Sequence, residues 1–274
     1  MLKTGLPMNI LSYLEIVYNE QGKAMKFLSE ELEDQEIFTP SMFVQYAAER
    51  RGLRVEDFGV NEMVLLLYSG NAQKRLIEKT NAETAPNWLY ADSRPLYNFS
   101  VKKRKVSMFR PFVGASAAAM YVEELIACGA RTIISYGYAG SLQQSVPIGH
   151  FVIPMRALRE EGVSYHYLPE KTVPNADEDV VSVLEEACAK HGVSYHKGAT
   201  WTTDAPYREM KAKVSKYREE GILTVEMEAS AIFSIGMFRK VKVGSLLTVS
   251  DELFDEWKPG FHATELEHAE HKAV

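Results

Sequence analysis

Apolar runs of strand length alternate with amphipathic segments of helix length along most of the chain from residue 63 onward. Continuous apolar runs are typical of strands buried on both faces. The predicted strands are 63–68, 105–109, 132–136, 151–158, 193–203, 222–225 and 243–249. The predicted helices are 72–80, 114–128, 177–190, 208–219, 228–240 and a last one from 264. This alternation predicts an α/β fold, with helices on both faces of a mainly parallel sheet.

The first 60 residues have a different pattern and predict a helical extension. Residues 11–32 show helical periodicity with an acidic end. A second helix is expected from Pro40, with Thr39 as its N-cap, and Gly52 is expected to stop it after about Arg51. We therefore predict an N-terminal helical extension over 1–60 and a main domain over 61–274.

Composition narrows the classes of partner. The net charge of -6 is unfavourable for nucleic-acid binding, and the one basic run, 102–105, is interpreted as a solvated hairpin tip rather than a phosphate-binding patch. No apolar run approaches the ~20 residues that span a bilayer, and no signal peptide is expected. Cys128 and Cys188 are interpreted as reduced core thiols rather than a disulfide. We expect a cytoplasmic protein without nucleic-acid or membrane partners.

Carboxylates stand at the ends of two predicted strands. Glu226 and Glu228 follow the strand 222–225, and Asp251 follows the strand 243–249. Ligands of open α/β sheets bind outside the carboxyl ends of strands, so these three residues are expected to meet in one pocket. From the residues alone, two structural alternatives stay open: Glu226 as a carboxylate at a helix N-terminus, and Asp251 with Ser250 as a turn cap.

Five segments, taken together and in order, resemble those of the nucleoside phosphorylase and nucleosidase superfamily. That group contains hexameric purine nucleoside phosphorylases, uridine phosphorylases and methylthioadenosine nucleosidases. The segments are 136–140 (YGYAG, similar to the family's glycine-rich turn), 161–165 (EGVSY), 203–208 (TDAPYR), 225–229 (VEMEA) and 249–251 (VSD). The resemblance covers about 63–271. It implies a phosphorylase-like three-layer α/β/α sandwich around a mostly parallel mixed sheet.

The resemblance also implies roles for single residues. Glu228 would hold the ribose 2′- and 3′-hydroxyls, with Met227 packed on the sugar and Glu226 lining the same pocket. Asp251 matches the acid that protonates the leaving purine, a contribution of about 10²–10⁴-fold in rate. Tyr207 would stack on the base, although a buried core tyrosine is an equal alternative. Arg208 would contact the base or begin a helix.

The phosphate-binding segments depart from the family pattern. The turn after the first strand reads GNAQKR over 70–75 where the family has Gly-Asp-Pro-x-Arg. Ser135 stands where a family arginine lies, and Tyr138 replaces a serine or threonine. Phosphate needs arginine or lysine forks and backbone N–H groups. The expected phosphate ligands are Gly70, Arg94, Gly137 and Tyr138. Arg94 would reach into a neighbouring subunit's site, and Lys74, Arg75 and Arg110 are possible substitutes.

The resemblance thus predicts a nucleoside phosphorylase, a pentosyltransferase that cleaves the N-glycosidic bond of a nucleoside with phosphate as co-substrate. The presence of Asp251 favours a purine, and the products would be free base and (deoxy)ribose 1-phosphate. Hydrolysis by a nucleosidase of the same fold is the first alternative, and a catalytically inactive nucleoside-binding protein is the second. No cofactor and no metal are expected, because His262, His268 and His271 are interpreted as parts of a solvated C-terminal helix. A homo-oligomer, dimer or hexamer, is expected.

Overall fold

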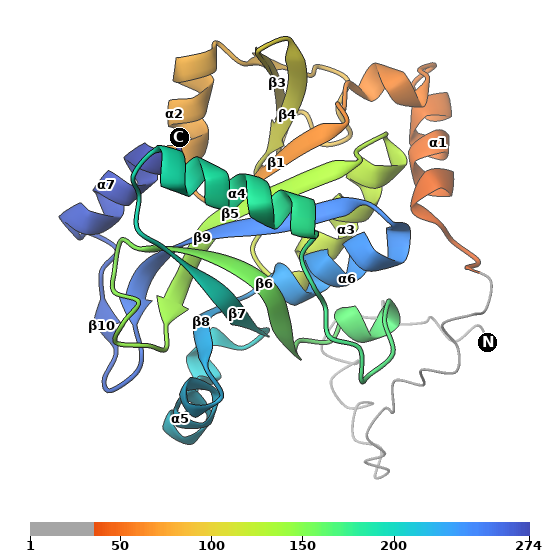
Figure 1. Cartoon of the computed structure of the whole chain (residues 1–274). Helices are drawn as coiled ribbons and strands as arrows, with labels where there is room; N and C mark the ends of the chain where they lie inside the picture. The colour runs from red at the N-terminus through yellow and green to blue at the C-terminus, as the bar shows by residue number, and fades with distance from the viewer. Residues whose placement is uncertain (1–35) are drawn as a thin grey trace, which may run out of the picture.

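The computed structural model describes residues 36–274, and the helix predicted over 11–32 lies outside them. A ten-stranded mixed sheet forms the middle layer, with helices packed on both faces (Figure 1). The strands are β1 Met63–Leu67, β2 Glu83–Thr84, β3 Leu96–Val101, β4 Arg104–Phe109, β5 Thr132–Ser141, β6 Phe151–Glu160, β7 Tyr195–Thr203, β8 Ile222–Glu226, β9 Lys242–Glu252 and β10 Lys258–Pro259. The α-helices are α1 Pro40–Arg50, α2 Gly70–Thr80, α3 Ala115–Ala127, α4 Glu178–Lys190, α5 Lys211–Glu219, α6 Ala229–Arg239 and α7 Thr264–Ala273. Short 3₁₀ turns lie at η3 Val55–Phe58, η4 Ser164–His166 and η5 Pro206–Arg208.

The three layers follow from the side-chain alternation of the strands. Leu66 and Leu67 are neighbours in β1 and therefore point to opposite faces of the sheet. Leu66 belongs to a hydrophobic cluster that contains residues of α1, α3, α4 and α6. Leu67 belongs to a second cluster that contains residues of α2 and α7. The predicted α/β/α sandwich is confirmed.

The two longest strand ladders, β5–β9 and β6–β7, are parallel, in agreement with the prediction of a mainly parallel sheet. β1 pairs in parallel with β4 and β5, β5 pairs in parallel with β9, and β7 pairs in parallel with β6 and β8. The antiparallel pairs are β2–β3, β3–β4, β5–β8, β6–β9 and β9–β10. The sheet is therefore mixed, with antiparallel pairs both at its edges and between the central strands β5 and β8 and β6 and β9.

Part of this sheet closes on itself, a feature that the sequence analysis did not predict. The strand order is β10-β9-β6-β7-β8-β5-β1-β4-β3-β2, and β9 also pairs with β5. The strands β5, β9, β6, β7 and β8 therefore form a closed ring. The register between β5 and β9 shifts between Ala139 and Gly140, where β5 turns to pair with β8. A bulge of this kind bends a strand and helps a sheet to close.

The same pairing changes two predicted boundaries. The segment 137–140 was expected to be a glycine-rich turn, but β5 continues through it to Ser141. Likewise β9 continues to Glu252, so Asp251 lies inside the strand rather than just after it. Both strands are longer than their apolar runs because their ladder partners continue past the apolar core.

The described part of the N-terminal extension behaves as its sequence predicts. Thr39 Oγ1 accepts the backbone N–H of Met42 at 3.1 Å, and α1 begins at Pro40. Val44, Ala48 and Phe58 are buried in the cluster that also contains α3 and α6. The division of the chain at residue 60 stays a prediction, since these side chains share the core of the main domain.

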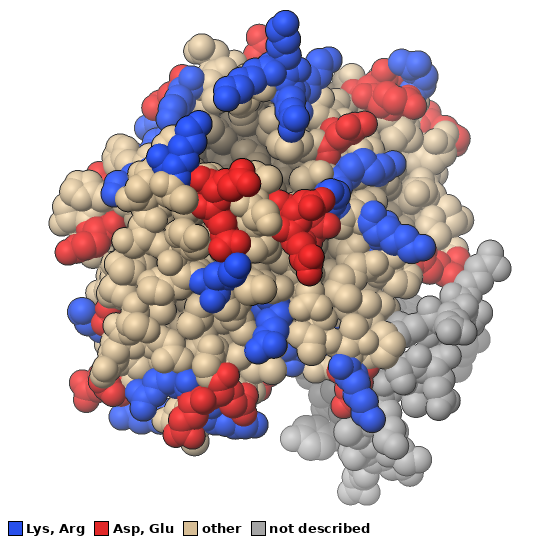
Figure 2. All heavy atoms as spheres, in the orientation of Figure 1, with Lys and Arg blue, Asp and Glu red and all other residues tan. Residues whose placement is uncertain are grey.

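The basic run lies at the tip of the β3–β4 hairpin, at the top of the molecule in Figure 2. Lys102 and Lys103 have φ of 47° and 69°, and residues 100–105 are all exposed. The prediction of a solvated tip is confirmed. Cys128 and Cys188 are both buried and free, as predicted. Across 36–274, no helix combines the length and the apolar character needed to cross a membrane.

Candidate functional site

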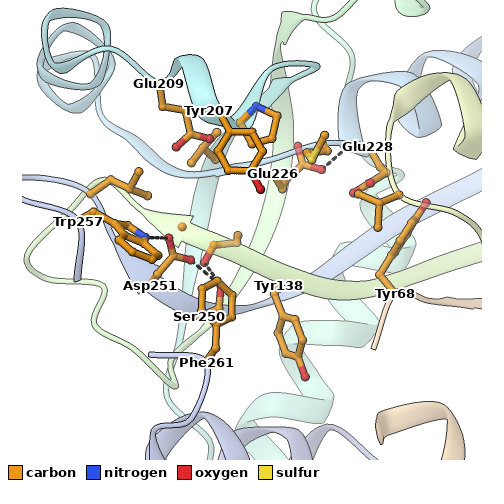
Figure 3. Close-up of a pocket in the computed structure, with 17 residues that line it drawn as sticks. Tyr68, Tyr138, Tyr207, Glu209, Glu226, Glu228, Ser250, Asp251, Trp257 and Phe261 are labelled. Atoms are coloured by element: carbon orange, nitrogen blue, oxygen red, sulfur yellow. Dashed lines mark hydrogen bonds between the residues drawn. The ribbon is translucent and has the colours of Figure 1, made fainter. Parts of the chain in front are cut away.

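A pocket of about 760 Å³ lies where β5, β8 and β9 end (Figure 3). Glu226, Met227 and Glu228 line it from the end of β8, and Asp251 lines it from β9. The prediction that Glu226, Glu228 and Asp251 line one pocket is confirmed, and their roles stay predictions. None of the lining residues is lysine, arginine or histidine, whereas Glu209, Glu226, Glu228 and Asp251 contribute four carboxyl groups.

Glu226 fixes the turn between β8 and α6. Its Oε2 atom accepts the backbone N–H groups of Glu228 and Ala229, each at 2.7 Å. Its Oε1 atom accepts the hydroxyl of Thr202 at 2.5 Å. Both oxygens are thus occupied by donors of the chain itself. The alternative of a carboxylate at a helix N-terminus describes this residue well, because α6 begins at Ala229.

The carboxyl group of Glu228 has fewer donors than that of Glu226 among the residues that the structure describes. Its Oε1 atom accepts the backbone N–H of Gly114 at 2.6 Å. Gly114 precedes α3 with φ of 107°, a conformation that favours glycine and that directs this N–H to the carboxylate. The other oxygen of Glu228 therefore remains available to a ligand. Sequence reasoning placed Gly114 at a helix start and missed this contact.

Burial changes the acid–base properties at this end of the pocket. Glu228 is 8% exposed, and burial followed by the charge of Glu226 raises its pKa above the ordinary value. Burial also raises the pKa of Glu226, but its hydroxyl and backbone donors oppose the shift. Tyr68 lines the pocket beside them, and burial and the charges of Glu228 and Glu226 raise its pKa well above the usual range. Its buried hydroxyl has no hydrogen-bond partner within 36–274.

Asp251 is held from two sides at the other end of the pocket. Trp257 donates its indole N–H to Oδ2 at 3.0 Å, and the hydroxyl of Ser250 donates to Oδ1 at 2.7 Å. A Cβ atom at Gly140 would clash with the end of the Leu253 side chain and would lie at an ordinary contact distance of 3.4 Å from the same Oδ2 atom. A side chain at position 140 would therefore displace Leu253 rather than Asp251. No sequence pattern pointed to Trp257, which lies in the loop after β9.

Of the two residues predicted to contact the base, Tyr207 lines the pocket and Arg208 does not. Tyr207 is 99% exposed and lines the pocket, so the alternative of a buried core tyrosine is wrong. In Figure 3 its ring stands over the space between Asp251 and Glu226. Arg208 is also exposed but does not line the pocket. Glu209, which the sequence analysis did not select, does line it.

The side of the pocket next to α2 is occupied by a network of hydroxyls and a carboxylate. Tyr138 lines the pocket, and its hydroxyl hydrogen-bonds to Glu270 of α7 and to Ser69 Oγ, the latter at 3.1 Å. Ser69 caps α2 and also donates to Glu270. Glu270 is only 3% exposed. The carboxylate therefore lies where the resemblance implied a phosphate.

The other residues predicted for phosphate do not line the pocket. Gly70 begins α2, and a Cβ atom there would lie 3.0 Å from Nη1 of Arg110. The guanidinium group of Arg94 lies 3.5 Å from the centre of the Phe112 ring. Gly137 lies inside β5, where a Cβ atom would be 3.3 Å from Cβ of Tyr68. Of the four predicted phosphate ligands, only Tyr138 lines the pocket.

The histidines near the C-terminus do not form a metal site with the described acidic residues. Within 36–274, no group of three or more histidine, cysteine, aspartate or glutamate side chains is placed to hold a metal ion. His271 instead contacts Arg75 of α2. The expectation of no metal and no cofactor stays a prediction.

Comparison with known proteins gives a consistent result. Residues 62–274 match the family model described as "Phosphorylase superfamily". A guanosine phosphorylase from Halorubrum lacusprofundi is 30% identical over 141 residues, which are 52% of this chain and 58% of that protein. A purine nucleoside phosphorylase of the DeoD type from Bacillus cereus is 30% identical over 169 residues, 60% of this chain and 72% of that protein. The chain thus spans less than two thirds of the guanosine phosphorylase.

The fold also has solved counterparts. The crystal structure of a uridine phosphorylase from Vibrio fischeri ES114 superposes with a TM-score of 0.69 over 79% of this chain and 88% of that chain. Its sequence identity of 23% shows a common fold and nothing finer.

Proposed function

This chain is a member of the phosphorylase superfamily, and on that premise we propose that it is an enzyme that cleaves the N-glycosidic bond of a purine nucleoside. One observation carries the proposal. A single pocket has the partly unpaired carboxyl group of Glu228 at one end and the anchored Asp251 at the other. The volume of about 760 Å³ is in the range of small-molecule sites.

At the sugar end, Glu228 binds the ribose hydroxyls. Its free oxygen accepts hydrogen bonds from hydroxyl groups, while the oxygen held by Gly114 fixes its direction. A carboxylate here also stabilises the positive charge that develops on the sugar as the glycosidic bond breaks. Met227 lines the pocket next to it and packs on the sugar. Glu226 positions Glu228 and does not bind the sugar directly, because Oε2 of Glu226 accepts the backbone N–H groups of Glu228 and Ala229.

At the base end, Asp251 protonates the leaving purine at N7. The purine departs with the electron pair of the broken bond, and the added proton makes it a neutral leaving group. Trp257 and Ser250 hold both oxygens of Asp251 in position. Tyr207 stacks on the base from the open side of the pocket. Arg208 contributes at the rim.

Phosphate is the acceptor that we propose first. The relatives named above are phosphorylases, and the start of α2 at Gly70 lies beside the guanidinium group of Arg110. A helix N-terminus with an adjacent arginine suits a dianion. Arg94 adds a second cation from a neighbouring subunit in the proposed homo-oligomer, and Gly137 and Tyr138 border the acceptor. The products are the free base and ribose 1-phosphate.

Water is the second candidate acceptor, and a specific observation favours it. Tyr138 and Ser69 hydrogen-bond to Glu270, so a buried carboxylate stands on the side of the pocket where phosphate would enter. A carboxylate repels a phosphate dianion but can accept a proton from water. In that case the product is free ribose.

Product analysis tests both parts of the proposal. Inosine, adenosine, uridine and methylthioadenosine are incubated with the full chain, each with and without phosphate. Release of purine only with phosphate, together with ribose 1-phosphate, supports phosphorolysis. Release independent of phosphate supports hydrolysis. Absence of base release from every nucleoside contradicts the proposed activity and leaves a nucleoside-binding protein.

A further inference from the structure

Glu209 is turned toward the pocket although the loop around it is solvent-exposed. Every other residue of 204–210 is exposed, whereas Glu209 is partly buried and lines the pocket. A glutamate in such a loop would gain more solvation by pointing outward. In Figure 3, Glu209 and Asp251 lie at the same end of the pocket, and their side chains come from different segments of the chain, above and below it. Two carboxyl groups therefore face the base end of the pocket.

These two carboxyl groups differ in their hydrogen bonds. Asp251 accepts from Trp257 and Ser250, so donors of the chain hold both of its oxygens. Among residues 36–274, no hydrogen bond or ion pair to the Glu209 carboxyl group is found. A half-buried carboxyl group without donors is stabilised as the neutral acid, which itself has an O–H to donate. Its natural partner is then an acceptor atom on the ligand.

The shape of a purine supplies that acceptor. N7 and the substituent at C6 lie on the same edge of the ring system, as the major-groove face of adenine and guanine shows. An acid that serves N7 therefore has the 6-position beside it. Resting on the function proposed above, we infer that Glu209 binds the 6-position of the purine and selects 6-oxopurine nucleosides through a protonated carboxyl group. The O–H of protonated Glu209 donates a hydrogen bond to the 6-oxo oxygen, which is an acceptor only.

The electrostatics of the pocket agree with this assignment. Burial, followed by the charge of Asp251, raises the pKa of Glu209 to about 7. Asp251 faces it from β9, Tyr207 lies next to it in the same loop, and Arg208 is its exposed chain neighbour. The other titratable groups of the pocket are Tyr68, Tyr138, Glu226 and Glu228. Near neutral pH, Glu209 thus exists both as a donor and as an ionised acceptor.

The two forms of Glu209 make a distinctive prediction. The protonated form donates to the oxygen of inosine, and the ionised form accepts from the amino group of adenosine. The ratio of kcat/KM for inosine to kcat/KM for adenosine should therefore fall roughly tenfold or more between about pH 6 and about pH 8. A ratio is the suitable readout, because titration of the groups at the sugar end affects both nucleosides equally and cancels.

The experiment compares the parent with Glu209→Gln over this pH range, using base release from both nucleosides. Glutamine both donates and accepts but does not titrate, so its ratio should be constant. Glu219→Gln, at an exposed position in α5, is the matched control and should retain the pH dependence of the parent. A constant ratio in the parent, or the same dependence in parent and Glu209→Gln, overturns the inference. If the parent releases base from neither nucleoside, the proposed function itself fails, and the inference falls with it.

Discussion

The backbone N–H of Glu228 donates to Oε2 of Glu226 over 2.7 Å, so one carboxylate of the pocket positions the residue that carries the next. The first is saturated by donors of its own chain, and the second keeps an oxygen free toward the pocket. The two glutamates, separated by a single residue, thus have different functions. One stabilises the turn before α6, and the other faces the ligand.

Glu226→Gln should therefore cost stability. Only one oxygen would remain on the side-chain amide. Its N–H group would face either the hydroxyl of Thr202 or the backbone N–H groups of Glu228 and Ala229, which now donate to the carboxylate. The free energy of unfolding should fall by about 1–3 kcal/mol, the usual cost of unpaired buried groups. Urea denaturation followed by circular dichroism measures it, with the exposed Glu219→Gln as the control. Equal midpoints for parent and Glu226→Gln would contradict the role given to Glu226.

The stability of the protein should depend on pH through Glu228. Its pKa is raised in the folded state from the ordinary value of 4.5, chiefly by burial. Above that ordinary value the unfolded chain releases a proton that the folded chain retains, so stability falls as pH rises toward the raised pKa. Glu228→Gln should reduce this fall. Urea midpoints at about pH 5 and about pH 8 give the comparison, and an unchanged pH slope in the variant would argue against the shift.

Asp251→Asn should lower the turnover of purine nucleosides at least about tenfold, because the amide has no acidic proton for the leaving base. Stability should change little, since an amide oxygen still accepts from Trp257. Trp257→Phe keeps the acid and removes one of its two anchors, so its loss of turnover should be smaller. Steady-state kinetics on inosine measure both variants. Parent-like turnover in Asp251→Asn would remove the acid from the mechanism.

Tyr138→Phe should loosen the contact between α7 and α2. The substitution keeps the ring but removes the hydroxyl bonded to Glu270 and Ser69. A loss of about 0.5–1.5 kcal/mol is expected for one hydrogen bond. A double-mutant cycle with Glu270→Gln measures the coupling by urea denaturation. Additive effects of the two substitutions would show that the hydroxyl and the carboxylate do not act together.

Much of the secondary structure was predictable from local pattern and capping chemistry. The helix after Asp177 was expected over 177–190 and is found at Glu178–Lys190, with Asp177 Oδ1 accepting the N–H of Val180. The start of α1 at Pro40 was predicted in the same way. These features depend on residues within a few positions of each other. The chain itself therefore carries the signal.

The site was predictable only in part. Position at the end of β8 marked Glu226 and Glu228, and the same argument marked Asp251. Gly114, Tyr68, Glu209 and Trp257 were missed. Tyr68, Glu209 and Trp257 line the pocket and Gly114 binds Glu228, but the local sequence pattern around each of them does not indicate this. The replacement of a serine or threonine by Tyr138 was visible in the sequence, but the direction of its hydroxyl, toward Glu270 of the distant α7, was not.

The order of strands and helices, the α/β class and the carboxylates at the strand ends could be predicted from the sequence alone, because periodicity, caps and chain position are local properties. Two other features follow from the tertiary structure alone: β5, β9, β6, β7 and β8 close into a ring, and within 36–274 both oxygens of Glu226 are occupied by donors of the chain while Glu228 is held at one oxygen by Gly114. Those outcomes depend on which distant groups become hydrogen-bond partners once the chain is packed. That choice is made by burial and geometry, and no single segment encodes it.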